Sequence, residues 1–125
     1  MSKILIVDDL TTEVQLMKAA MSKLGHHFLE ASDGETGFNL AKTQQPDLIL
    51  LDVVLPKADG FSVCRRLKKD PETSHIPIII ISTKNQESDQ FWGLKQRADG
   101  YLFKPTKADD LVEMVTRNLK MSAST

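Results

Sequence analysis

Five short apolar runs recur along the chain, and each is followed by polar residues. The runs are four to six residues long and lack clear alternation, which is typical of strands buried on both faces of a sheet. The isoleucine-rich run would promote aggregation at an exposed edge, so we expect it inside the sheet. The runs are KILIV (3–7), the weaker HFLEA (27–31), PDLILL (46–51), IPIIII (76–81) and GYLF (100–103).

Segments with helical character separate these runs and follow the last one. There are five such segments. Two of them are 32–43 and 61–71, and the other three carry apolar side chains at helical spacing along one side. These side chains are Val14, Met17, Met21 and Leu24; Phe91, Leu94 and Ala98; and Leu111, Val112, Val115 and Leu119.

Capping patterns predict where some of these helices begin and end. Thr12 with Gln15 and Ser32 with Glu35 have the spacing of a capping box. Gly25 predicts the end of the first helix.

The order is therefore strand then helix, five times over, which predicts an α/β fold with a parallel sheet covered by helices on both sides. A chain of 125 residues is the size of one domain. We expect a single domain over residues 1–120 and a flexible C-terminal tail over 121–125.

Composition narrows the possible functions. The net charge of −1 argues against nucleic-acid binding, and we expect the basic stretch at 65–69 to be a solvated face. No apolar run approaches the roughly 20 residues of a membrane span. No signal-peptide pattern precedes the first run, and the lone Cys64 fits a reducing compartment, so we expect a cytoplasmic protein.

Polar side chains follow four of the apolar runs where each strand ends. The carboxyl ends of parallel strands meet at one edge of an open sheet, and ligands bind there. Residues that are distant in sequence should therefore come together at this edge. They are Asp8, Asp9, Asp52, Ser82, Thr83 and Lys104.

These residue types suit phosphoryl transfer. Clustered carboxylates repel one another unless a cation intervenes, and oxygen ligands alone favour Mg²⁺. Lys104 and the Ser82 hydroxyl can stabilise phosphoryl oxygens, and a carboxylate can act as the nucleophile. Asp52 stands alone on the middle strand, whereas Asp8 and Asp9 form a pair suited to metal, so Asp52 is the candidate phosphoacceptor.

The chain resembles the receiver domains of two-component signalling, of the stand-alone chemotaxis response-regulator kind. The resemblance covers residues 3 to about 120 and depends on four motifs at strand ends. It implies a doubly wound, flavodoxin-like three-layer sandwich with strand order 2-1-3-4-5. The 82–105 stretch also resembles the small regulators of type IV pilus twitching and phototaxis systems. The motifs are VDD (7–9), LLDVVLPKADG (50–60), ISTK (81–84) and YLFKP (101–105).

The resemblance implies a metal site and a phosphodonor. Asp52 would accept phosphate from a histidine kinase. Asp9, Asp52 and the backbone carbonyl of Val54 would bind Mg²⁺, and Asp8 would orient a metal-bound water.

The resemblance also implies a switch. Lys104, which a cis peptide joins to Pro105, would contact the phosphoryl group, and Ser82 would shift toward it. Tyr101 would change rotamer and report the change on the face formed by the fourth helix, fifth strand and fifth helix, where a downstream protein binds. Simple packing of Tyr101 under a helix is the alternative.

Four positions depart from the family pattern or influence the phosphorylation chemistry in the family. Leu55 stands where Met is usual, a swap that conserves volume. Thr83 is bulkier than the usual Ala or Gly, so we expect narrower access to Asp52. Val54 and Lys84 occupy positions that influence phosphate lifetime in the family.

We thus expect a single-domain response regulator, monomeric or weakly dimeric, that catalyses only its own phosphotransfer and dephosphorylation. An aspartyl-phosphate phosphatase or mutase is one alternative, but such enzymes carry a second Asp where this chain has Val54. A second alternative is a receiver that binds partners without phosphorylation. The presence of Asp8, Asp9, Asp52 and Lys104 together argues against it.

Overall fold

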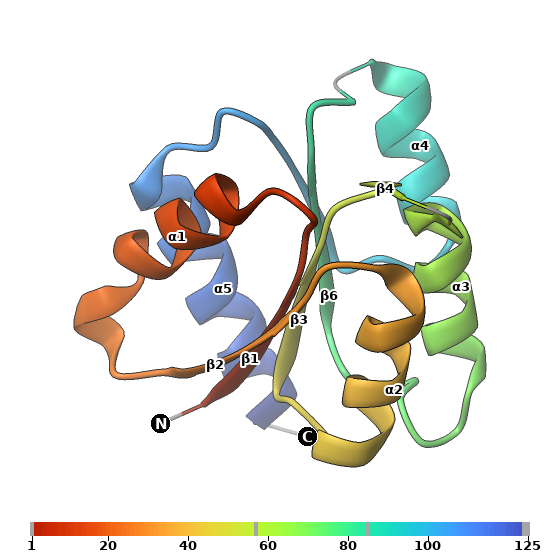
Figure 1. Cartoon of the computed structure of the whole chain (residues 1–125), viewed down its shortest axis with the longest axis horizontal. Coiled ribbons are helices and arrows are strands. Elements are labelled where there is room, and N and C mark those ends of the chain that lie inside the picture. Colours follow the sequence, from red (N-terminus) through yellow and green to blue (C-terminus); the bar gives the residue numbers. More distant parts are fainter. Residues whose placement is uncertain (1, 57, 85, 124–125) are drawn as a thin grey trace.

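A five-stranded parallel sheet lies between two layers of helices in the computed structural model (Figure 1). The structure describes residues 2–56, 58–84 and 86–123. The strand order is β2-β1-β3-β6-β7, which confirms the predicted order 2-1-3-4-5 by position in the sheet. The strands are β1 (Lys3–Val7), β2 (His27–Ala31), β3 (Leu48–Leu51), β6 (Ile78–Ser82) and β7 (Gly100–Phe103).

Helices α1 and α5 cover one face of this sheet, and α2, α3 and α4 cover the other (Figure 1). A two-stranded antiparallel hairpin, β4 (Val54–Leu55) with β5 (Ala58–Asp59), follows β3. The helices are α1 (Thr11–Ala20), α2 (Gly34–Gln44), α3 (Gly60–Lys69), α4 (Glu87–Lys95) and α5 (Ala108–Ala123), with a short 3-10 helix at Ser22–Leu24.

Successive strand residues point to opposite faces of the sheet and fill two separate cores. In β1, Leu5 and Val7 contact the core under α2 and α3, while Ile4 and Ile6 contact the core under α1 and α5. Both faces need apolar side chains, which is why β1, β3 and β6 read as continuous apolar runs. Strand β2 differs from the prediction, because it is an edge strand and only its last residue is buried.

The helix starts differ from the predicted capping boxes. In α1 the capping position is Leu10, without a side-chain cap, so the Thr12–Gln15 prediction is wrong. In α2 the cap is Asp33, one residue after the predicted Ser32, and its carboxylate accepts a hydrogen bond from the Thr36 amide at 2.8 Å. Gly25, predicted to end the first helix, has a left-handed φ of 73° and caps the 3-10 helix, whereas α1 itself ends earlier, at Ala20.

Two predictions about side-chain burial are also wrong. Phe91 and Leu94 of α4 are 56% and 54% exposed, and the buried residue of this helix is Gly93. Lys68, expected on a solvated face, is buried, and its ammonium lies 2.9 Å from the Asp99 carboxylate. In both places the buried residue of the helix is not a large apolar one, so the hydrophobic pattern of the sequence does not reveal the contact.

The C-terminal helix extends beyond the expected end of the domain at residue 120. Helix α5 continues to Ala123, so the tail predicted for 121–125 is helical up to that residue, and 124–125 lie outside the described residues. Within the ranges that the structure describes, no helix is long and apolar enough to cross a membrane.

Arg97 follows α4 with a left-handed φ of 70° and donates a hydrogen bond to the Lys68 carbonyl. A side chain with a Cβ makes this conformation unfavourable by about 1 kcal/mol, and glycine does not. Arg97→Ala keeps the strain and loses the hydrogen bond, whereas Arg97→Gly loses both. We expect Arg97→Gly to be more stable than Arg97→Ala by about 1 kcal/mol in urea unfolding. Equal urea midpoints for the two variants would show that the left-handed conformation at this position is not strained.

Candidate functional site

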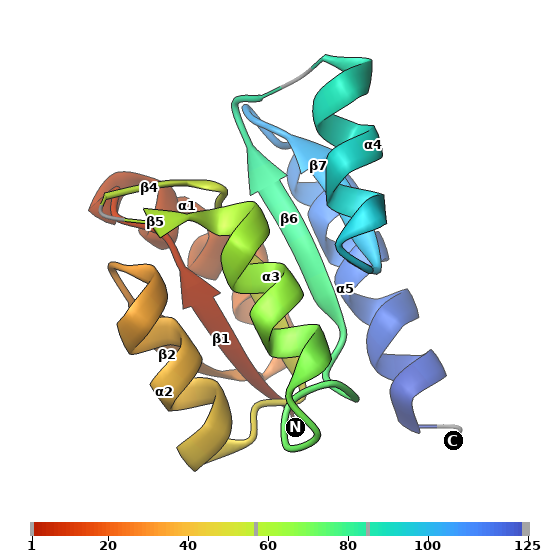
Figure 2. The same ribbon diagram turned by 90° about the vertical axis from the view of Figure 1, so that its right-hand side faces the viewer.

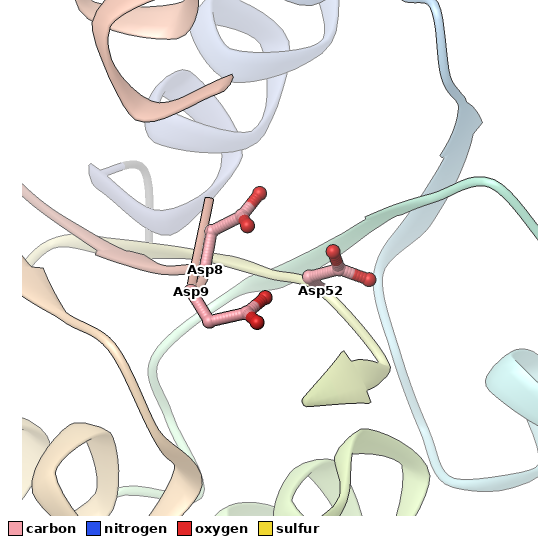
Figure 3. Close-up of side chains that lie close together, drawn as sticks. All are labelled: Asp8, Asp9 and Asp52. Atoms are coloured by element: carbon pink, nitrogen blue, oxygen red, sulfur yellow. The ribbon is translucent and has the colours of Figure 1, made fainter. Parts of the chain in front are cut away.

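The carboxyl ends of β1 and β3 bring three carboxylates together. Val7 pairs with Leu51 in the sheet, so the residues that follow each strand emerge side by side. Figure 3 shows Asp8 and Asp9 leaving β1 beside Asp52 at the end of β3. One oxygen from each carboxylate lies within 4.8 Å of the others. The convergence of Asp8, Asp9 and Asp52 predicted from the sequence is therefore found in the structure.

Lys104 joins two of these carboxylates from the end of β7. Its ammonium lies 2.7 Å from Asp8 Oδ2 and 3.0 Å from Asp52 Oδ2, and at most 5% of any of the three side chains is exposed. Burial acts to lower the pKa of Lys104, but the hydrogen bonds to Asp8 and Asp52 outweigh it and raise that pKa above the usual lysine value. The lysine is thus held in its charged form.

Backbone amides fix the other oxygens of the two buried carboxylates. Asp8 Oδ1 accepts a hydrogen bond from the Leu10 amide, and Asp52 Oδ1 accepts one from the Val54 amide, each at 2.9 Å. Asp9 is exposed and completes the cluster from the solvent side. Carboxylate oxygens without sulfur or imidazole partners are a donor set that suits Mg²⁺.

The chain after Asp52 returns close to the strand end, and only a glycine fits there. A Cβ on Gly60 would lie 2.2 Å from Val53 Cα and 2.6 Å from the Asp52 carbonyl oxygen. The Gly60 amide donates to the Val53 carbonyl at 3.0 Å, which holds the start of α3 against the site. The sequence identified Gly60 only as part of a motif and did not reveal this contact.

Ser82 lies at the end of β6, next to the strand that carries Asp52. It is fully buried, and its hydroxyl oxygen accepts a hydrogen bond from the Lys84 amide at 3.3 Å. Thr83 and Lys84 are exposed in the loop that follows, and Val54 is 47% exposed at the rim. Narrower access to Asp52 through Thr83, and the tuning roles of Val54 and Lys84, stay predictions. The cis peptide between Lys104 and Pro105 is confirmed.

Tyr101 packs inward beneath α4. Its hydroxyl donates to the Lys84 carbonyl at 2.8 Å, and burial, together with the charges of Asp89 and Asp52, raises the pKa of Tyr101 to about 12. The Lys84 backbone therefore contacts Ser82 through its amide and Tyr101 through its carbonyl.

Cys64 and Trp92 lie outside this arrangement. Cys64 is buried, and desolvation raises its pKa to about 12, so it is a packing residue with little thiolate. Trp92 is 53% exposed on α4.

Lys104→Met should leave Asp8 and Asp52 buried without their cation. Breaking a buried pair from one side destabilises a protein by roughly 3–5 kcal/mol, so we expect a loss of this order in urea unfolding. Lys107→Met, at an exposed position, is the matched control and should leave the midpoint unchanged. A Lys104→Met midpoint equal to the wild type would show that the ion pairs contribute nothing.

Comparisons with known proteins agree with this geometry. A family model described as the response regulator receiver domain matches residues 4–116. Protein PilH of Pseudomonas aeruginosa is 45% identical over 115 residues, which cover 92% of this chain and 95% of that protein. Response regulator PleD of Caulobacter vibrioides is 41% identical over 104 residues, but these are 83% of this chain and only 23% of PleD.

Solved structures share the fold over nearly the whole chain. A putative response regulator from Chloroflexus aurantiacus superposes with a TM-score of 0.91 at 29% identity, covering 95% of this chain and 98% of the other. The receiver domain of the sensor histidine kinase PA1611 from Pseudomonas aeruginosa superposes with a TM-score of 0.87 at 28% identity, with the same coverage. That crystal structure has a magnesium ion coordinated in its active-site cleft.

Proposed function

The chain belongs to the response regulator receiver domain family, and from this premise we propose that Asp52 accepts a phosphoryl group from a histidine kinase. The contact between the Lys104 ammonium and Asp52 Oδ2 is the observation that carries the proposal. It places a fixed positive charge at the carboxylate where the negative charge of a phosphoryl group would develop.

In the proposed transfer, a carboxylate oxygen of Asp52 forms a bond to phosphorus while the phosphorus–nitrogen bond of a phosphohistidine breaks. The electron pair of that bond stays on the imidazole. The buried Lys104 neutralises charge on the transferring oxygens, and the Val54 amide orients the Asp52 carboxylate. Bound Mg²⁺, held by Asp9 and Asp52 with Asp8 beside them, would supply further neutralising charge.

The phosphoryl group would also change the hydrogen bonds around the site. It carries about −1.5 to −2 charge in place of the single charge of the carboxylate, and its three acceptor oxygens compete with Asp8 for Lys104 and attract the Ser82 hydroxyl. Movement of Ser82 would disturb its bond with the Lys84 amide and hence the loop before α4. The change is then read by a protein partner on the face formed by α4, β7 and α5, which lie beside one another in Figure 2. Phe91 and Leu94 of α4 and Phe103 of β7 are exposed.

We further propose a biological setting. The identity with protein PilH, over almost the full length of both chains, and the resemblance of residues 82–105 to type IV pilus regulators support a role in pilus-dependent motility. The protein would act in the cytoplasm as a monomer or weak dimer. It would turn over no external substrate, because Val54 supplies no acid or base where phosphatases of related architecture carry a second Asp.

Incubation with acetyl phosphate and Mg²⁺ should add the mass of one phosphoryl group to the wild-type protein. Asp52→Asn should gain none, because the amide is not a nucleophile, and chelation of Mg²⁺ should abolish the wild-type adduct. Asp47→Asn, at an exposed aspartate at the opposite edge of the sheet, is the control and should be modified like the wild type. Mass spectrometry of the intact protein measures the yield, and an undiminished yield in Asp52→Asn would contradict the assignment.

A further inference from the structure

The peptide group between Val7 and Asp8 connects the members of the acidic cluster. Its carbonyl oxygen, on Val7, accepts a hydrogen bond from the Asp52 amide at 2.9 Å. Its N–H, on Asp8, donates to the Ala31 carbonyl at 3.0 Å. Displacement of this peptide would move Asp8 and Asp9 directly and would stretch the bond to Asp52. The spacing of the three carboxylates therefore depends on where this peptide lies.

The side chain of Val7 packs beneath α2, where Gly37 lies against it. A Cβ on Gly37 would lie 2.8 Å from Val7 Cγ2 and 3.1 Å from Val7 Cγ1. Carbon atoms in ordinary van der Waals contact are about 3.5–4.0 Å apart, so both distances are too short for a side chain. The missing side chain at position 37 thus lets α2 pack directly on the last residue of β1.

Val7 has no rotamer that avoids a side chain at position 37. Its two methyl groups occupy the two staggered positions that face the helix, and only one further staggered position exists. Rotation of the side chain therefore leaves at least one methyl group within 3.1 Å of an added Cβ. Val7 is 1% exposed and has no open space beside it. Helix α2 is held in turn by Phe38 and Ala41, which are buried in the same core.

We infer that Gly37 is a positioning residue for Mg²⁺ binding and that it acts through Val7. Close packing of α2 on Val7 sets the position of the peptide between Val7 and Asp8, and this peptide sets the spacing of the carboxylates. Spacing matters because Mg²⁺ requires near-ideal octahedral geometry. The inference deepens the proposed function, on which its meaning for phosphoryl transfer rests.

Gly37→Ala should weaken Mg²⁺ binding by on the order of tenfold, which is the lower end of the losses that follow removal of a group supporting a metal ligand. Titration with MgCl₂, followed through the backbone amide signals of residues 8, 9 and 52 in two-dimensional NMR, measures Kd. The same spectra show whether the variant is folded, and the measurement needs no phosphodonor. A wild type whose signals do not respond to Mg²⁺ would overturn the inference.

Gly34→Ala is the matched control, because it is the same substitution one turn earlier on α2. A Cβ at Gly34 would lie 2.6 Å from Val63 Cγ2, so it overpacks the helix against α3 and not against the end of β1. Its Mg²⁺ affinity should equal that of the wild type. Unchanged affinity in Gly37→Ala, or an equal loss in Gly34→Ala, would overturn the role of Gly37.

A second substitution separates positioning from simple destabilisation. Val7→Ala removes the methyl groups that the added Cβ would meet, but it also removes apolar contacts from the core. The double variant, Gly37→Ala with Val7→Ala, should therefore recover Mg²⁺ affinity while staying less stable than the wild type in urea unfolding. Affinity that stays low in the double variant would mean that Mg²⁺ binding follows stability, and the inference would fail.

Val7→Ile makes the same test from the strand if Gly37→Ala does not fold. It adds a methyl group to the branch that begins at Cγ1, which already lies 3.1 Å from the Cβ position of Gly37. Weaker Mg²⁺ binding is expected, and wild-type affinity would overturn the inference. Failure of Asp52 to accept phosphate would defeat the proposed function but leave these comparisons valid. Equal Mg²⁺ affinity in all variants would defeat the inference and leave phosphoryl transfer to Asp52 standing.

Discussion

The ion pairs of Lys104 with Asp8 and Asp52 are the interaction on which the arrangement of the site depends. Each carboxylate is almost fully buried at the end of an apolar strand, where an isolated charge would be strongly destabilising. The ammonium of Lys104, just after β7, offsets the charge of both carboxylates, and backbone amides donate hydrogen bonds to their other oxygens. Because these groups follow the ends of β1, β3 and β7, the site forms only when these strands are assembled in one sheet.

Close backbone approaches are the second constraint on this architecture. Gly60 lets the start of α3 lie against Val53 and Asp52, and Gly93 lets α4 lie against Tyr101. The first contact holds the loop that follows Asp52, and the second holds α4 against β7. Both glycines thus connect the chemistry at the strand ends to the surface through packing, without contributing a reactive group.

The strand ends could be predicted from the sequence because parallel strands align their carboxyl ends whatever the details of packing. Asp8, Asp9, Asp52 and Lys104 therefore converge as expected. The orientation of α4 could not be predicted, because its apolar Phe91 and Leu94 face solvent while the contact with the sheet is made by Gly93. A glycine that is needed for close approach leaves no hydrophobic signal, and neither does a buried lysine such as Lys68, whose partner Asp99 is distant in sequence.

The central claim is that these strand ends make Asp52 the phosphoryl acceptor. Reduction of the phosphorylated protein with borohydride converts an acyl phosphate on aspartate to homoserine, and tandem mass spectrometry of the peptides then locates the modified residue. We expect a single conversion, at position 52, that depends on Mg²⁺. Conversion at position 8 or 9, or none in a protein that has gained phosphoryl mass, would contradict it.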